Sequence, residues 1–281
     1  MEEKRYGEPI GADDYEEPRC PLCMEKPGDE ERIHTIDMRR VMEKLDEYLA
    51  RKDYAAAEKH LKYWLAEARA GCDQRGELLV LNEMIGHYRK TGRPEEALGA
   101  AEKALRLSEE MGYKGSFSRA TTCVNAATAY QAFGRPERAL ELFIEAKAVF
   151  EGGNCVRRDL LGGLYNNMGL TLASLGRYDE AFDSYFKALD QMAGQPRGNL
   201  ESAVTYLNMA NALEARTGLE KGEKQISEWV EKACSLLNEP GAEDGYYAFV
   251  LEKCAPTIAY YGYFAEAEDM SGRAKRIYER A

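Results

Sequence analysis

Residues 164–189, with the sequence LYNNMGLTLASLGRYDEAFDSYFKAL, contain the pattern that decides the fold. Apolar residues recur at three- and four-residue intervals on both sides of Gly176, which is the period of an amphipathic helix. A glycine can end the first helix in a left-handed conformation, and the acidic residues Asp179 and Glu180 favour the positive end of the next helix. The stretch therefore predicts two α-helices joined by a tight turn.

The same turn recurs along the chain. The phrases GRPEEA at 92–97, GRPERA at 134–139 and GRYDEA at 176–181 match one another, and successive copies start 42 residues apart. Weaker copies start at Lys52, Gly218 and Gly262. Six copies at a regular period are typical of a helical repeat array. Residues 33–281 are therefore expected to form an all-α solenoid of about six helical hairpins.

The spacing inside each phrase predicts how the helices pack. Ala97, Ala139 and Ala181 stand where two helices must approach closely, and bulky residues such as Phe143 and Tyr185 follow four positions later. Residues four apart lie on one face of a helix, so small and large side chains can interdigitate.

Two departures from the pattern are expected at the C-terminal end. Pro256 stands inside the sixth first helix, where a proline should kink or shorten it. The turn after Gly218 should hold about three extra residues, because the apolar pattern that follows it is shifted.

Asparagine also repeats in the first helix of each hairpin. Asn125, Asn167 and Asn208 align in the segments VNAATAY, NNMGLTL and LNMANAL. With the turn phrase, this pattern resembles the tetratricopeptide repeat over roughly residues 36–280. Its period exceeds the common ~34 residues and is similar to that of kinesin light chains and bacterial peptide-responsive regulators. The resemblance implies a right-handed α-α superhelix that binds a protein or peptide and needs no cofactor.

In that family the first helices line the concave face, and asparagine at this register resembles those that hold the backbone of an extended peptide. A side-chain amide can donate and accept, so it can pair with any peptide unit. The resemblance implies a peptide-binding groove formed by Asn82, Asn125, Thr128, Asn166, Asn167, Asn208 and Asn211. The alternative is that these amides satisfy local backbone groups or neighbouring repeats.

One type of ligand is disfavoured. Family members that grip a C-terminal carboxylate need Lys or Arg on the same helices, and the corresponding positions here are Thr121, Gly163 and Val204. A strongly acidic peptide terminus is therefore not expected.

Residues 1–32 form a different region, with eleven Asp or Glu against five Lys or Arg. This composition predicts an acidic, loop-like arm. Cys20 and Cys23 have the spacing of half a zinc site, and His34 is the nearest further ligand, so a structural zinc ion held by these three residues is one prediction. Two reduced cysteines without a metal are the alternative.

The other five cysteines are scattered through helical patterns and are expected to be small buried residues. They are Cys72, Cys123, Cys155, Cys234 and Cys254.

Composition narrows the class of partner. The net charge of −11 disfavours nucleic acid and anionic membranes, because both are bound by clustered Lys and Arg. The chain shows no signal peptide and no apolar run of the ~18 residues that a membrane span needs, which predicts a cytoplasmic protein.

No enzyme is expected, because His60 and His87 stand in helical patterns without a catalytic motif. The favoured function is an adaptor or regulator, and one alternative is a peptide sensor that acts through a partner protein. Another is self-assembly, for example as a homodimer, through zinc or through the aromatic cluster Tyr246, Tyr247, Tyr260, Tyr261, Tyr263 and Phe264.

Overall fold

A computed structural model describes residues 33–152, 158–239, 241 and 243–280, and within them helices are the only regular elements. The helices of this part are α1 (Met38–Ala50), α2 (Tyr54–Ala70), α3 (Gln74–Lys90), α4 (Pro94–Glu110), α5 (Phe117–Ala132), α6 (Pro136–Gly152), α7 (Arg158–Ser174), α8 (Tyr178–Met192), α9 (Gly198–Thr217), α10 (Leu219–Leu237), α11 (Gly245–Tyr260) and α12 (Phe264–Arg280). Consecutive pairs form six hairpins, which we call repeats 1 to 6. The predicted all-α repeat fold is confirmed.

The turns are left-handed as predicted. Gly92, Gly134 and Gly176 have φ angles of 68°, 71° and 73°, a region that glycine occupies without steric cost. In repeat 1 the same position is filled by Lys52, with φ of 55°. These turns reverse the chain within a few residues and place the second helix of each repeat against the first.

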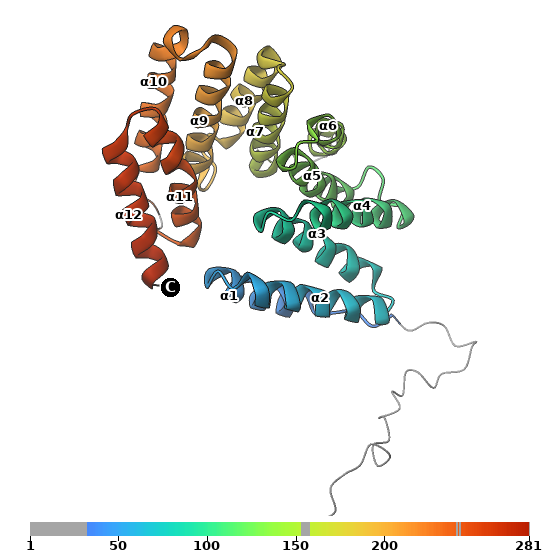
Figure 1. Cartoon of the computed structure of the whole chain (residues 1–281). Helices are drawn as coiled ribbons and strands as arrows, with labels where there is room; N and C mark the ends of the chain where they lie inside the picture. The colour runs from blue at the N-terminus through green and yellow to red at the C-terminus, as the bar shows by residue number, and fades with distance from the viewer. Residues whose placement is uncertain (1–32, 153–157, 240, 242, 281) are drawn as a thin grey trace, which may run out of the picture.

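The repeats share a layered core. The odd-numbered helices α3, α5, α7, α9 and α11 run along the inner side of the curve, and α4, α6, α10 and α12 lie outside it (Figure 1). Ala139 and Ala181 are completely buried, as are the large side chains of Phe143 and Tyr185. Small and large residues of the predicted pattern are thus buried in one common core.

The curvature of the solenoid brings its two ends together. Repeat 6 lies beside repeat 1, and the molecule approaches a closed ring (Figure 1). Lys52, between α1 and α2, contacts Glu252 on α11 across 200 residues of sequence, with 3.5 Å between Nζ and Oε1. Within the described ranges, every helix is too short or too polar to span a lipid bilayer.

Two sequence predictions for the C-terminal repeats differ from the structure. Pro256 lies inside α11, which continues to Tyr260 and is as long as α5, so the proline does not shorten the helix. The chain between α9 and α10 is a single residue, Gly218. The extra residues of this repeat instead lengthen α10 to 19 residues, because continuing a helix satisfies backbone groups that a longer loop would leave open.

The prediction of cysteine burial is confirmed at three of the four described positions. Cys123, Cys234 and Cys254 are buried, as small apolar residues usually are. Cys72 is exposed in the turn before α3, where its φ is 53°, and the prediction is wrong there. Cys155 lies outside the described residues.

Candidate functional site

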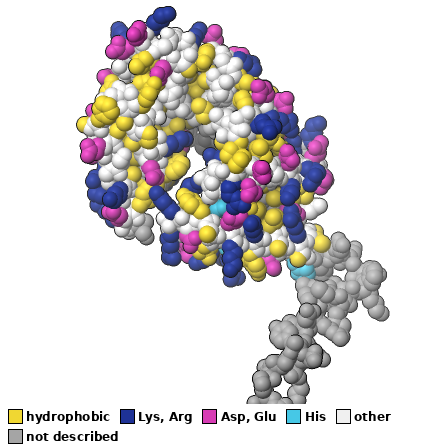
Figure 2. Space-filling view, viewed as in Figure 1, with side chains coloured by type: hydrophobic (Ala, Val, Ile, Leu, Met, Phe, Trp, Pro, Cys, Tyr) yellow, Lys and Arg dark blue, Asp and Glu magenta, His cyan; other side chains and the backbone are white. Residues whose placement is uncertain are grey.

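The inner helices present a stripe of small and neutral polar side chains. On α5, Thr121 is exposed and Asn125 and Thr128 are half-buried, at intervals of three or four residues that place them on one face. Asn167 on α7 is also half-buried. These helices line the inner side of the ring (Figure 1), around the hollow that is open in Figure 2. We call the inner surface of the helices that carry this stripe the groove.

Two asparagines pair across the joint between repeats 2 and 3. Asn125 Nδ2 donates to Asn82 Oδ1 at 2.9 Å. Asn82 Nδ2 donates to the carbonyl oxygen of Leu78 at 2.9 Å and to Thr122 Oγ1 at 3.1 Å. Asn82 is 9% exposed, so it lies inside the joint and fixes the amide of Asn125.

The joint between repeats 4 and 5 repeats this arrangement. Asn208 Nδ2 donates to Asn166 Oδ1 at 3.0 Å, and Thr205 Oγ1 donates to the same oxygen at 3.1 Å. In the sequence, Asn82 stands 43 residues before Asn125, one position out of register with the 42-residue period. The structure places it in the register of Asn166, two repeat periods later, which is the register of the buried partner.

The remaining groove residues have different surroundings. Among the described residues, the side chain of Asn167 has no hydrogen-bond partner, and neither do the amide oxygens of Asn125 and Asn208. Thr128 donates to the carbonyl oxygen of Asn125 at 2.8 Å. Asn211 is exposed and accepts from Tyr261 Oη at 2.9 Å.

Sequence analysis missed three charged residues of the inner helices. Enclosure by the surrounding protein raises the pKa of Glu83, and Asp46 adds to this effect. Enclosure likewise raises the pKa of Glu201 and lowers that of Arg89, although Arg89 is exposed to solvent. These shifts are expected in a hollow where water is partly replaced by protein. The repeat period could have pointed to Glu83, because this residue stands 42 residues before Asn125 and so occupies the equivalent position of repeat 2.

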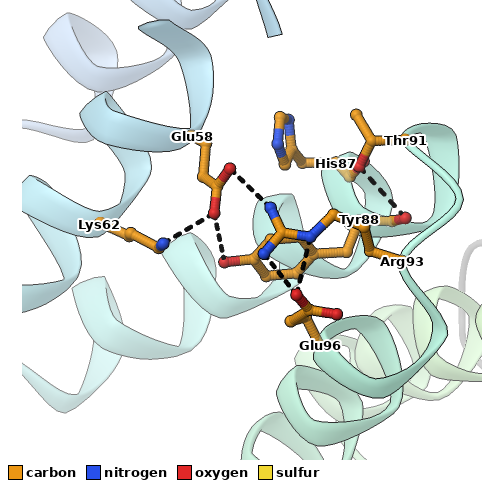
Figure 3. A network of polar contacts seen from close by, with 7 residues as sticks. All are labelled: Glu58, Lys62, His87, Tyr88, Thr91, Arg93 and Glu96. Atoms are coloured by element: carbon orange, nitrogen blue, oxygen red, sulfur yellow. Dashed lines mark hydrogen bonds and ion pairs between the residues drawn. The ribbon is translucent and has the colours of Figure 1, made fainter. Parts of the chain in front are cut away.

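A cluster of charges joins repeats 1 and 2 (Figure 3). Glu58 on α2 accepts from Arg93 Nη1 at 2.7 Å and pairs with Lys62 Nζ at 2.7 Å. Arg93 also binds Glu96 and stacks on the ring of Tyr88, 4.8 Å from its centroid. Hydrogen bonds from Lys62 and Arg93 lower the pKa of Glu58 to about 2. The cluster therefore links repeat 1 to repeat 2.

The predicted zinc site cannot be assembled from the described part of the chain. Cys20 and Cys23 lie outside the described residues. His34 is exposed, and its backbone N–H donates to the carbonyl oxygen of Gly71 at 2.9 Å. Within the described ranges, no three His, Cys, Asp or Glu side chains lie close enough together to hold a metal ion. Zinc binding by Cys20, Cys23 and His34 stays a prediction.

The two histidines of the helices, His60 and His87, differ in burial. His60 is half-buried, and its Nε2 lies 3.0 Å from the carbonyl oxygen of Val41. His87 is buried, at 6% exposure, and its Nδ1 has no partner in the described structure.

The C-terminal aromatic cluster is partly core and partly surface. Tyr247 is buried, whereas Tyr260 and Phe264 are 65% and 70% exposed. Tyr260 Oη and Tyr261 Oη both donate to Glu214 on α9, at 2.6 and 2.9 Å. Most of the cluster therefore fastens repeat 6 to repeat 5.

Stacked helical hairpins with a polar inner groove define a repeat solenoid of the kind that mediates protein interactions. Models of the tetratricopeptide repeat match residues 76–152 and 161–190. These two stretches of the chain are tetratricopeptide repeats.

Solved structures agree with this fold. BtubC (BKLC) from P. vanneervenii is 20% identical, with a TM-score of 0.61 over 73% of this chain and 83% of that one. NprR in complex with its cognate peptide NprX is 17% identical, with a TM-score of 0.57 over 86% of this chain and 67% of that one. A putative kinesin light chain from Podosopora anserina, with nearly identical TPR-like repeats, is 17% identical over 71% and 93%, with a TM-score of 0.50. No curated protein matches the sequence.

Proposed function

We propose that the chain is a non-catalytic interaction module that binds an extended peptide or protein segment in the groove, as a bacterial cytoplasmic adaptor or regulator. The repeat fold supports a protein- or peptide-binding role. NprR, which shares the fold, was solved with a peptide bound.

The observation that carries the proposal is the state of the groove amides. Asn125 and Asn208 are each held by one donated hydrogen bond to a buried asparagine, and their oxygens are left without a protein partner among the described residues. Asn167 lies between them along the solenoid, and neither the oxygen nor the nitrogen of its side-chain amide has a hydrogen-bond partner among the described residues. Fixed polar groups bind with a smaller loss of conformational entropy than mobile ones.

The chemistry of these groups suits a peptide backbone. The oxygens of Asn125 and Asn208 can accept from backbone N–H groups, and the amide of Asn167 can donate and accept at once. Thr121, Gly163 and other small or neutral side chains complete the middle of the groove, so we expect recognition of backbone shape more than of charge.

Affinity capture tests the proposal. The full chain and an Asn125→Ala/Asn167→Ala/Asn208→Ala variant are used to retain proteins from a bacterial lysate, with retained proteins quantified by mass spectrometry. We expect the variant to lose at least one partner, and Asn167→Ala alone to weaken the purified complex about 3- to 10-fold, the value of one or two hydrogen bonds. Far-UV circular dichroism checks that the helices are intact.

The matched control changes polar residues on the outer face. Glu102→Ala/Lys103→Ala alters two exposed side chains of α4 and should retain every partner. If the groove variant retains the same partners as the unmodified chain, the asparagines are structural and the groove is not the binding site.

Self-assembly is a second candidate, favoured by the exposure of Tyr260 and Phe264 at the C-terminal repeat. Exposed aromatic residues at the end of a solenoid can form a contact between copies. Light scattering should then detect a dimer that Phe264→Ser converts to a monomer. A concentration-independent monomer in the unmodified chain would exclude this candidate.

A further inference from the structure

The two ends of the solenoid meet at a seam formed by the turn between α1 and α2, the end of α3, and helices α11 and α12. Lys52 Nζ lies 3.5 Å from Glu252 Oε1 and 4.3 Å from the ring centroid of Tyr278. Tyr278 Oη donates to Glu252 Oε2 at 3.3 Å. Lys90 Nζ lies 5.6 Å from the ring centroid of Phe249. The ring is thus closed by charged and aromatic contacts.

These contacts are exposed and weak. The side chains of Lys52 and Glu252 are 49% and 56% exposed, and exposed ion pairs contribute little to stability. Among the described residues, the buried core that includes repeat 1 contains no residue of α11 or α12, and the core of repeat 6 contains none of α1 to α3. In this part of the chain no apolar core crosses the seam, whereas repeats 1 to 4 share one.

The core also divides at a second place, within repeat 5. One buried cluster spans repeats 1 to 4 together with Met209 and Ala212 of α9, and the other spans the rest of repeat 5 with repeat 6. Tyr206 and Trp229 pack against both clusters. Two bodies joined here can rotate relative to each other, and the seam lies where such a rotation has its largest effect.

Closure restricts what can reach the groove. A cavity of about 780 Å³ at the seam is lined by residues that include Tyr54, Lys90, Phe249 and Tyr278, and the raised pKa values of Glu83 and Glu201 reflect the enclosure of the hollow. A free chain end can thread a closed ring. A segment with folded domains on both sides cannot, so it can enter only through an opened seam.

The geometry points to a clamp: the seam around Lys52 and Glu252 opens to admit an extended segment that lies between folded regions of its partner, and closes around it. This inference rests on the proposed function and specifies the kind of partner. It also makes the seam, and not the groove asparagines, the element that controls loading.

Opening is measured first without any partner. Dyes are attached at introduced cysteines on the outer faces of α2 and α12, after Cys20, Cys23, Cys72 and Cys155 are changed to serine. Lys52→Glu places two like charges at the seam, and we expect it to lower the transfer efficiency between the dyes. Raising NaCl from about 0.05 M to about 0.5 M should lower it in the unmodified seam, because salt screens exposed charges.

The matched control is Lys103→Glu, which makes the same charge change at an exposed site of α4. It should leave the transfer efficiency unchanged. An efficiency that neither Lys52→Glu nor salt alters overturns the clamp, because the seam would then be a fixed joint.

Loading is measured with a library of random twelve-residue segments, displayed either as free-ended peptides or between two ubiquitin domains. The ring is locked by a bismaleimide bridge between Lys52→Cys and Glu252→Cys in the same serine background. We expect the unlocked ring to enrich the same segments in both formats, and the locked ring to lose those held between domains. Equal enrichment by the locked ring overturns the inference.

The two measurements separate this inference from the proposed function. If the unlocked ring enriches no segment in either format, peptide binding in the groove fails. The response of the dyes to Lys52→Glu and salt then decides alone whether the seam opens.

Discussion

Asn82 and Asn125 are joined across the boundary of two repeats by a hydrogen bond of 2.9 Å between their side-chain amides. Asn82 is buried and Asn125 is half-buried, so we expect a structural role for Asn82 and, under the proposed function, a binding role for Asn125. The same division holds for Asn166 and Asn208, at 3.0 Å. The asparagines therefore form two sets, and we expect substitution of the buried set to affect stability and substitution of the other set to affect binding.

Asn82→Ala should destabilise the fold by about 1–3 kcal/mol. The substitution removes the acceptor of Asn125 and the donor to Thr122 inside a buried joint, and unsatisfied buried groups are costly. Urea unfolding followed by circular dichroism measures the change. Asn167→Ala is the control, because that amide has no protein partner among the described residues, and its effect should stay within about 0.5 kcal/mol. Equal effects of the two substitutions would contradict the division into two sets.

Gly169→Ala should also destabilise the fold, by about 1–3 kcal/mol. A methyl group on residue 169 would lie 2.5 Å from Cε1 of Tyr185, whose ring is completely buried. Gly163→Ala, on the same helix, meets no atom within 4 Å and should stabilise the helix by about 0.5–1 kcal/mol, since alanine is the better helix former.

Thermal unfolding of the two alanine variants side by side checks this contrast. A similar shift of the melting temperature in both would mean that the close approach of α7 to Tyr185 does not limit the packing. Tyr185→Leu combined with Gly169→Ala should recover part of the loss, because it removes the ring that the methyl group meets.

The sequence was sufficient to predict the repeats and their turns. Gly134 and Gly176 need a left-handed backbone, and Ala139 and Ala181 need close helix contact, so local constraints determine these elements. The length of the fifth turn could not be predicted, because adding residues to α10 or to a loop leaves the same pattern of apolar residues.

The seam and the asparagine pairing depend on longer-range geometry. The approach of Lys52 to Glu252 results from small rotations between successive repeats, added over six repeats. No local sequence pattern predicts their total. Whether Asn125 meets position 82 or 83 depends on the stagger of two adjacent helices. Register alignment compares equivalent positions, and so it cannot reveal a pairing that is offset by one residue.

Glu58 should make the fold sensitive to acid. Its folded-state pKa is about 2 because Lys62 and Arg93 donate to its carboxylate. The stabilisation is therefore present above the unfolded pKa near 4.5 and is lost as the pH falls from there through about 2. Glu58→Gln should cost about 1–2 kcal/mol at pH 7, allowing for partial exposure.

Unfolding free energies at pH 7, 4 and 3 measure this effect. The difference between the unmodified chain and Glu58→Gln should shrink as the pH falls. Glu102→Gln, on an exposed residue of α4, is the control and should show no such convergence. A constant difference for Glu58→Gln would show that the carboxylate does not depend on its charged partners.

Protonation of His87 should make the free energy of unfolding fall at a higher pH than protonation of Glu58 does. Burial lowers the pKa of its ring below 6.5, although Glu58 partly opposes the shift. As the pH falls through about 6.5, the unfolded chain gains a proton that the folded chain does not, so stability declines. His87→Phe should remove up to about 1.4 kcal/mol of the loss between pH 7.5 and 5.5. Glu58 titrates below this range, and the comparison of the unmodified chain with His87→Phe separates the histidine from the other titrating groups. An unchanged slope in His87→Phe would show that the buried ring accepts its proton without unfolding.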